Sequence, residues 1–190
     1  MFIFATSKFK IMSRITLKDK SFKTFIPFEE IERKVQDVAN KLNNDYKNID
    51  TPIFLSVLNG SFMFTASLMQ KIDFLGELSF IKLASYSGTS STGAVKEVIG
   101  LNADVKGRHI IIIEDIVDTG GTIKELYKIL QDKGATDIKV CTLFLKPDSY
   151  KGAVKIDYPA MNIGNDFIVG YGLDYDQLGR QYKDIYVIDL

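Results

Sequence analysis

The sequence is poor in the residues that build covalent cross-links and soft-metal centres. Its single cysteine, Cys141, excludes an intramolecular disulfide and suits a reducing compartment such as the cytoplasm. Because Cys141 lies within the apolar run DIKVCTLFL, we interpret it as a buried structural thiol rather than a nucleophile. The single histidine, His109, has no second histidine or cysteine cluster to join, so we expect no zinc site.

The sequence also lacks an excess of charge and a long hydrophobic run. Its 24 basic and 24 acidic residues balance, so nothing draws it generally to nucleic acid or to a membrane surface. No apolar run reaches the roughly 18 residues of a membrane-spanning helix. The start, MFIFATSKFKIMSR, places apolar residues before its lysines, which is the reverse of a secretory signal. We expect residues 1–20 to be a disordered extension and residues 21–190 to form one domain.

The most informative stretch is residues 108–123, RHIIIIEDIVDTGGTI. Four consecutive isoleucines run into Glu114 and Asp115, and the small residues 118–122 precede a helical pattern. This order predicts a buried strand, a tight loop and a helix start, where backbone N–H groups bind phosphate. Acids beside a phosphate would repel it unless they hold a cation or hydroxyl groups of the same ligand. The stretch therefore predicts a phosphorylated sugar or nucleotide bound with a divalent cation.

Strands and helices alternate along the rest of the chain. Apolar runs predict strands at residues 51–58, 78–85, 96–101, 137–145, 166–172 and 185–190. Helical spacing predicts helices at residues 28–46, 62–72 and 124–133. Residues 148–165 are polar and are expected to be irregular. The alternation predicts an α/β fold with a parallel sheet flanked by helices, whose ligands bind at the carboxyl ends of the strands.

Two common nucleotide-binding motifs are missing, and a third pattern is present. No GxGxxG opens a helix after a strand, and the 118–122 loop lacks the lysine of a Walker motif. Instead, IIIEDIVDTGGTI resembles the phosphoribosyl diphosphate (PRPP) motif of type I phosphoribosyltransferases. The segments LNGS, SY, LKP and FIVGYGLDY occur in the order typical of the hypoxanthine-guanine phosphoribosyltransferases. The resemblance covers about residues 20–190.

The resemblance implies a purine salvage enzyme of the pentosyltransferase class. Such an enzyme transfers the 5-phosphoribosyl group of PRPP to hypoxanthine, giving IMP and pyrophosphate, with Mg²⁺ as cofactor. Guanine and xanthine remain open as further substrates. The resemblance also implies a homodimer or homotetramer. Its fold would add a small hood, built from the N-terminal arm and the segment after Lys146, and a flexible hairpin lid containing Ser85 and Tyr86.

By the same resemblance, the 108–123 stretch would bind the phosphoribosyl half of PRPP. The 5′-phosphate would contact Asp118, Thr119, Gly120, Gly121 and Thr122. Glu114 and Asp115 would hold the ribose hydroxyls, directly or through hydrated magnesium. Asp118 would be the catalytic residue, near purine N7, and would take or share a proton as the base attacks C1′.

The remaining roles fall to segments outside that stretch. Pyrophosphate would bind Asn59, Gly60, Ser61 and Arg180. Lys146 would donate to the 6-oxygen of an oxopurine and so select against adenine, whose 6-amino group is a donor. Phe167 would stack on the purine, and the Ile168 backbone would contact the base edge. Asp174 would bind a second magnesium and contribute to base choice.

Two positions depart from the family pattern, and three other functions stay open. Asn59 stands where many relatives have lysine, and Gly121 stands where some have lysine.

The alternatives are a phosphoribosyltransferase for another base, a PRPP-binding regulatory module without catalysis, and a nucleotide-binding domain without preference for PRPP. Pyrophosphate release across a panel of bases separates the first two, and a comparison of PRPP with AMP binding separates the third.

Overall fold

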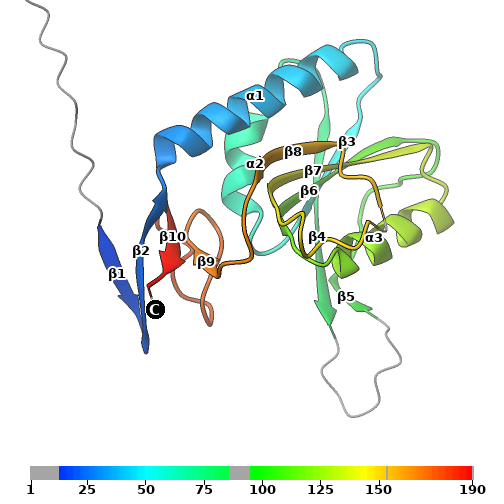
Figure 1. The fold of residues 1–190 in the computed structure, drawn as a ribbon. Coiled ribbons are helices and arrows are strands. Elements are labelled where there is room, and N and C mark those ends of the chain that lie inside the picture. Colours follow the sequence, from blue (N-terminus) through cyan, green and yellow to red (C-terminus); the bar gives the residue numbers. More distant parts are fainter. Residues whose placement is uncertain (1–12, 86–94, 153, 190) are drawn as a thin grey trace, which may run out of the picture.

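The structure, a computed structural model, describes residues 13–85, 95–152 and 154–189. Figure 1 shows a core sheet with helices packed on it and a smaller sheet beside it. The core strands are β3 (Ile53–Val57), β4 (Glu77–Ser85), β5 (Val95–Ile99), β6 (His109–Val117), β7 (Asp137–Leu145) and β8 (Tyr158–Asn162). Their order across the sheet is β5-β4-β3-β6-β7-β8. All pairs are parallel except β4–β5, so the predicted parallel sheet is confirmed.

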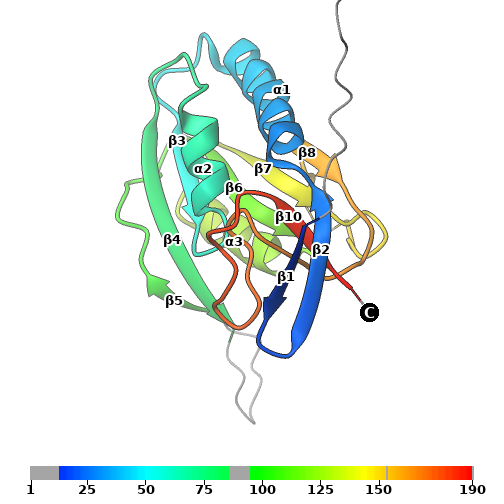
Figure 2. The ribbon, with the colours of Figure 1, turned by 90° about the vertical axis from the view of Figure 1, so that its left-hand side faces the viewer.

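The helices cover both faces of this sheet. They are α1 (Phe28–Tyr46), α2 (Phe62–Met69) and α3 (Gly121–Asp132). The isoleucine run of β6 explains how one strand serves both faces, because successive side chains point to opposite sides. Ile111 and Ile113 pack in the cluster beneath α1 and α2, whereas Ile110 and Ile112 pack in the cluster beneath α3. Figure 2 shows α1 and α2 on one side of the sheet and α3 beyond it.

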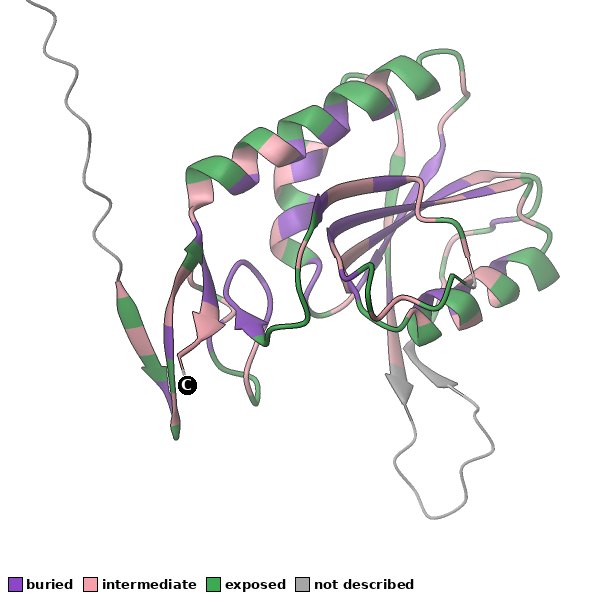
Figure 3. Cartoon of the chain, viewed as in Figure 1, coloured by how far each residue is buried: buried purple, intermediate pink, exposed green. Residues whose placement is uncertain are grey.

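Helix α1 has the bounds that the spacing of its apolar residues predicts. Its buried side chains are Ile31, Val35, Val38, Ala39, Leu42 and Tyr46. Figure 3 shows this buried stripe facing the sheet and the exposed residues facing outward. Pro27 precedes the first turn, and the Phe28 N–H donates to Asp184 Oδ1 at 2.8 Å. A residue close to the C-terminal strand therefore satisfies one of the free N–H groups at the start of α1.

The smaller sheet, called the hood here, joins the two ends of the described chain. Its strands are β1 (Arg14–Leu17), β2 (Lys20–Ile26), β10 (Ile185–Ile188) and β9 (Ile168–Val169), in that order and all antiparallel. Leu17, Phe22, Val169 and Tyr186 form its own small core. The part of the expected N-terminal extension from residue 14 to residue 17 is thus a strand. Residues 1–12 lie outside the described part of the chain.

Two expectations for the C-terminal third need correction. Residues 148–165 are not irregular throughout, because Tyr158–Asn162 forms β8 at the edge of the core sheet. Pro159 obscured this strand, yet an edge strand tolerates a residue without an N–H donor. The strand expected over residues 166–172 shrinks to Ile168–Val169, because Gly170 turns the chain with φ +98°. Of the segment after Lys146, the hood therefore takes only the part that follows β8.

The expected lid can be followed only at its base. Ser85 is the last residue of β4, which pairs antiparallel with β5, as a hairpin requires. Tyr86 lies outside the described residues. No helix among the described residues is long and apolar enough to span a membrane.

Candidate active site

The acid pair and the 118–122 loop form one continuous wall at the carboxyl end of β6. Strand β6 continues through Glu114 and Asp115 to Val117. The two acids therefore lie near the end of the strand and not after it. Gly120 adopts φ +85°, and α3 begins at the next residue. A cleft of about 380 Å³ is lined by Glu114, Ile116, Val117, Asp118, Thr119, Gly120, Gly121, Thr122, Ile123 and Glu125. The loop leads into the N-terminus of α3 and lines a cleft. Backbone N–H groups at a helix N-terminus that face a cleft are the usual arrangement for binding phosphate.

Tyr150 packs directly on this loop. A Cβ added to Gly120 would lie 2.4 Å from the Tyr150 ring, so only glycine fits there. The Tyr150 hydroxyl donates to the Val154 carbonyl and accepts the Val154 N–H at 3.0 Å. The Tyr150 N–H donates to the Lys146 carbonyl at 3.0 Å. Sequence reasoning missed Tyr150, because a lone tyrosine in a polar segment carries no local signal of this contact.

The two acids of β6 are held in an unfavourable environment for negative charge. Burial, and then the neighbouring Asp115 charge, raise the pKa of Glu114 well above its ordinary value. Burial raises the pKa of Asp115 to about 6, although the Ile116 N–H at 2.8 Å and the Arg180 charge act to lower it. Glu114 Oε2 is buried without a hydrogen-bond partner. The pair is therefore suited to a cation or to hydroxyl donors that arrive with a ligand.

The 59–61 loop lies against this acid pair. A Cβ on Gly60 would lie 1.5 Å from Asp115 Oδ2, so the backbone of Gly60 touches the carboxylate. The Leu58–Asn59 peptide is cis, and Asn59 is exposed. Ser61 is buried, and its hydroxyl bonds inward to Ser56 Oγ at 2.8 Å and to the Val57 carbonyl. Of the three loop residues expected to meet pyrophosphate, Ser61 therefore has no free side chain to offer.

The C-terminal hairpin closes on the 59–61 loop from the other side. Gly172 has φ +100°, and a Cβ there would lie 2.0 Å from the Gly60 carbonyl oxygen. Arg180 donates from Nη1 to the Gly172 carbonyl at 2.8 Å and pairs through Nη2 with Asp174 Oδ1 at 2.7 Å. The expected pyrophosphate residues Gly60 and Arg180 and the expected metal residue Asp174 thus belong to one contiguous surface beside Asp115.

Of the residues expected to recognise the base, Lys146 lies against Asp118. Lys146 Nζ lies 3.2 Å from Asp118 Oδ2 and 3.5 Å from the carbonyl of Asn165, two residues before Phe167. Phe167 is 43% exposed and packs edge-on against Tyr175, with ring centroids 5.9 Å apart. The Ile168 side chain is buried, which leaves its backbone as the part available to a ligand. Lys146 therefore lies against Asp118, which lines the phosphate cleft, and Phe167 presents a half-exposed ring two residues after Asn165.

A family model for the phosphoribosyl transferase domain matches residues 27–176, which include the acid pair, the two loops and the hairpin as far as Asp174. The chain belongs to the phosphoribosyltransferase family. Its relatives include hypoxanthine-guanine phosphoribosyltransferases of Streptococcus pyogenes, 43% identical over 84% of this chain and 88% of that protein. The enzyme of that name from Mycobacterium tuberculosis is 35% identical over 85% of this chain and 83% of that protein.

Solved structures place this phosphoribosyltransferase in the same branch. A hypoxanthine phosphoribosyltransferase of Staphylococcus aureus aligns with a TM-score of 0.82 and 31% identity, over 87% of this chain and 90% of that one. The Trypanosoma cruzi hypoxanthine phosphoribosyl transferase aligns with a TM-score of 0.83 and 32% identity, over 92% of this chain and 95% of that one. The recognised fold and the enzyme class are therefore confirmed.

Proposed function

We propose that this phosphoribosyltransferase transfers the 5-phosphoribosyl group of PRPP to hypoxanthine, and to guanine as a second substrate, in purine salvage. The observation that carries the proposal is the Lys146–Asp118 pair at the edge of the phosphate cleft, with 3.2 Å between Nζ and Oδ2. A cationic donor and an acid side by side suit a 6-oxopurine, whose oxygen accepts a hydrogen bond and whose N7 releases a proton. The names of the relatives agree with this choice.

Selection of the base follows from the donor at Lys146. Its ammonium group has no acceptor capacity, so it favours the 6-oxygen of hypoxanthine and leaves the 6-amino group of adenine without a partner. Phe167 presents an exposed ring on which the purine stacks. As N9 forms its bond to C1′ and the C1′–O bond to pyrophosphate breaks, the N7 proton passes to the carboxylate of Asp118.

The phosphoribosyl half is held by the wall that β6 and α3 form. The 118–122 loop receives the 5′-phosphate, and Glu114 and Asp115 accept hydrogen bonds from the ribose hydroxyls. The same carboxylates favour the positive charge that develops on the ribose as the bond to pyrophosphate breaks. Water would trap that ribose, so we assign Ser85 and Tyr86 to a lid that excludes it.

Magnesium fits the residues that are present. Among the described residues, no group of three or more His, Cys, Asp or Glu side chains forms a complete metal site. Magnesium is commonly bound by one or two carboxylates together with substrate phosphates, and the unpartnered Oε2 of Glu114 beside Asp115 supplies such a site. Asp174 would serve a second ion on the pyrophosphate side. When bound, magnesium would neutralise charge on the leaving pyrophosphate.

The test of the proposal is a panel of bases offered with PRPP and magnesium, with pyrophosphate release as the readout. Release is expected with hypoxanthine and guanine and not with adenine or orotate. Release with adenine alone would reassign the base. Binding of PRPP without release for any base would favour the regulatory module, and AMP binding as tight as PRPP binding would favour a plain nucleotide-binding domain.

The assembly and setting of the enzyme complete the proposal. We expect the core sheet and the hood, including β1 and β2, to act as a single domain within a homodimer or homotetramer, in the cytoplasm, where the buried thiol of Cys141 stays reduced. Light scattering on the purified chain gives the molar mass that decides between monomer, dimer and tetramer.

A further inference from the structure

The hairpin that follows β9 has a strained corner. Gly170 and Leu173 exchange two backbone hydrogen bonds of 3.0 Å, so Tyr171 and Gly172 form the corners of a tight turn. Both corners lie in the left-handed region, with φ +46° at Tyr171 and φ +100° at Gly172. Glycine adopts this region freely, whereas a tyrosine there must be held by contacts elsewhere.

The side chain of Tyr171 makes such contacts by leaving the hood and entering the core. It is 1% exposed and packs among the residues beneath α1 and α2. Its hydroxyl donates to Glu32 Oε1 of α1 at 2.7 Å. Burial raises the pKa of the Tyr171 hydroxyl, so this hydroxyl stays a neutral donor.

Glu32 is itself fixed by α2, which makes it a rigid anchor. It accepts Ser67 Oγ at 2.7 Å through Oε1 and Lys71 Nζ at 2.7 Å through Oε2. Burial acts to raise the pKa of Glu32, but the hydrogen bonds from Lys71, Ser67 and Tyr171 outweigh it and hold the pKa below its ordinary value. The carboxylate is therefore ionised, and its bond to the Tyr171 hydroxyl is charge-assisted.

What this anchor holds is the surface beside the acid pair. Gly172, next to Tyr171, rests against the Gly60 carbonyl, and Arg180 binds the Gly172 carbonyl while it pairs with Asp174. A rotation of the turn would move Gly172, Arg180 and Asp174 together, because the backbones of Gly60 and Gly172 are in close contact and have no room to shift independently. The turn therefore sets the distance between the two sides of the expected pyrophosphate site.

We propose that Tyr171 is a positioning residue for the pyrophosphate half of PRPP, acting through its hydrogen bond to Glu32 at 2.7 Å. The bond seats Gly172 on the 59–61 loop and so places Asp174 and Arg180. This inference rests on the proposed function, because it takes PRPP as the ligand. It adds a residue of the core helix α1, Glu32, to the determinants of PRPP affinity.

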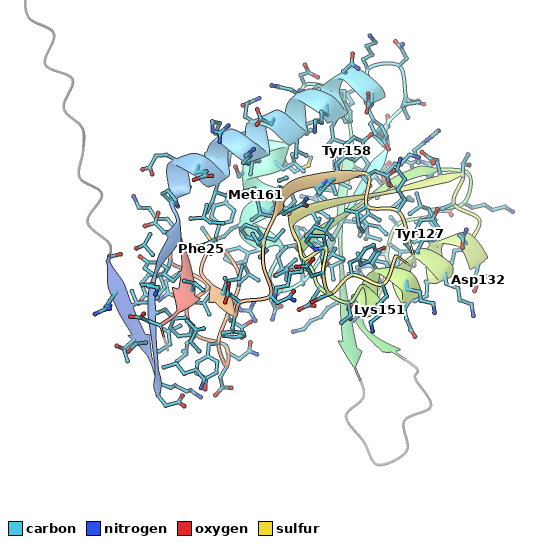
Figure 4. All side chains as sticks on the ribbon, in the orientation of Figure 1. Phe25, Tyr127, Asp132, Lys151, Tyr158 and Met161 are labelled. Atoms are coloured by element: carbon cyan, nitrogen blue, oxygen red, sulfur yellow. The ribbon has the colours of Figure 1, made fainter. Side chains whose placement is uncertain are left out.

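The chain offers a matched control for this bond. Tyr158, on β8, is 9% exposed, belongs to the same core cluster and donates its hydroxyl to Asp45 Oδ2 of α1 at 2.9 Å. It is the same chemistry on the same helix, but β8 lies on the edge of the core sheet and its turn carries none of the expected site residues. Figure 4 labels Tyr158 beside α1, well away from the hood.

The experiment compares Tyr171→Phe with Tyr158→Phe in the full chain. Steady-state kinetics give KM for PRPP, KM for hypoxanthine and kcat, calorimetry gives Kd for PRPP, and thermal melts give Tm. For Tyr171→Phe we expect KM and Kd for PRPP to rise about 5–10-fold, as for one lost charge-assisted hydrogen bond. KM for hypoxanthine should rise less than KM for PRPP, because Lys146 does not depend on this bond.

The outcomes separate positioning from stability. Tyr158→Phe should lower Tm to a similar degree while all three kinetic constants stay near wild type. A Tyr171→Phe variant with unchanged KM and Kd for PRPP overturns the inference, and so does an equal rise in both variants. Should wild type bind PRPP but release no pyrophosphate, the catalytic proposal fails, while the Kd comparison still decides the role of Tyr171.

Discussion

Lys146 Nζ and Asp118 Oδ2 lie 3.2 Å apart, so the residue expected to read the base and the residue expected to take its proton are each other's partners. The lysine side chain is 9% exposed and the acid 49% exposed, which leaves the pair open on the acid's side. Under the proposed function, an entering oxopurine would replace the carboxylate as the acceptor for Lys146. That exchange would free Asp118 to receive the N7 proton, so base binding and release of the carboxylate would be one event.

Replacement of Lys146 tests this exchange. We expect Lys146→Ala to lower kcat/KM for hypoxanthine about 10–100-fold, because a buried charged donor to the 6-oxygen is lost. Kd for PRPP should stay within about twofold, because Lys146 does not line the cleft of the 118–122 loop. Lys155→Ala is the control, because Lys155 also pairs with an acid, Asp157, but is 82% exposed. Equal losses in base and PRPP binding would contradict the assignment.

Replacement of Asp118 tests proton transfer. Asp118→Asn keeps the size of the side chain and an oxygen for Lys146, but it removes the basic carboxylate. We expect kcat to fall about 10²–10⁴-fold, the usual range for loss of a general base, with PRPP affinity largely kept. Asp132→Asn at the exposed end of α3, labelled in Figure 4, is the matched control and should leave kcat unchanged. An active Asp118→Asn enzyme would exclude this carboxylate as the base.

Burial of Asp115 predicts a specific dependence of stability on pH. Its pKa is about 6 in the folded protein against an ordinary 3.8, so the folded state favours the protonated acid. The contribution of protonated Asp115 to the free energy of unfolding is fully present below its ordinary pKa of 3.8. It is lost as the pH rises through about 6. In EDTA and without PRPP, Asp115→Asn should therefore unfold with a free energy up to roughly 3 kcal/mol higher than wild type at neutral pH.

The difference in the free energy of unfolding between Asp115→Asn and wild type should become smaller as the pH is lowered. Urea denaturation from pH 4.5 to pH 7.5 measures it, with Asp132→Asn as the exposed control that should track wild type. PRPP with magnesium should remove the advantage of the variant, because we expect the ligand to bind the intact acid pair more tightly than the altered one. A variant that is less stable than wild type at pH 7.5 would mean that Asp115 is compensated within the protein.

The two glycines of the 118–122 loop provide a paired test of its shape. Gly120 combines φ +85° with the Tyr150 ring, which a Cβ would approach to 2.4 Å, whereas a Cβ on Gly121 meets nothing within 4 Å. We expect Gly120→Ala to lower the free energy of unfolding by about 1–2 kcal/mol and to raise KM for PRPP at least about tenfold. Gly121→Ala should leave both near wild type. Similar effects in the two variants would show that Tyr150 does not constrain the loop.

The parts of the fold that follow from local pattern are those where burial is continuous. The apolar positions of α1 and the isoleucines of β6 predict a helix and a strand, because the apolar residues on each buried face follow without a gap. The acid pair and the 118–122 loop are likewise contiguous in sequence, so their neighbourhood in space is set by one strand and one helix start. The family resemblance then supplies the distant segments around Lys146 and Phe167.

The parts that the pattern misses depend on tertiary contacts. Strand β8 contains Pro159 and is stable only because β7 offers an edge to it. Ser61 turns inward because Ser56 is there to receive it. Tyr150 and Tyr171 act on loops far from them in sequence, and neither the Gly120 contact nor the Glu32 bond has a local signature.

Strand β10 lies between β2 and β9, so the hood is held together by the last of the described strands to be synthesised. On the ribosome, β2 emerges early and keeps one edge unpaired while every strand of the core sheet follows it. The core sheet with Glu114, Asp115 and the 118–122 loop is complete before β9 and β10 exist. A nascent chain at that point has the expected sugar-phosphate wall and Lys146, but it has no β10 against which the segment that begins at Phe167 can pair. We therefore expect substrate discrimination to be the final property that this protein acquires during its own synthesis.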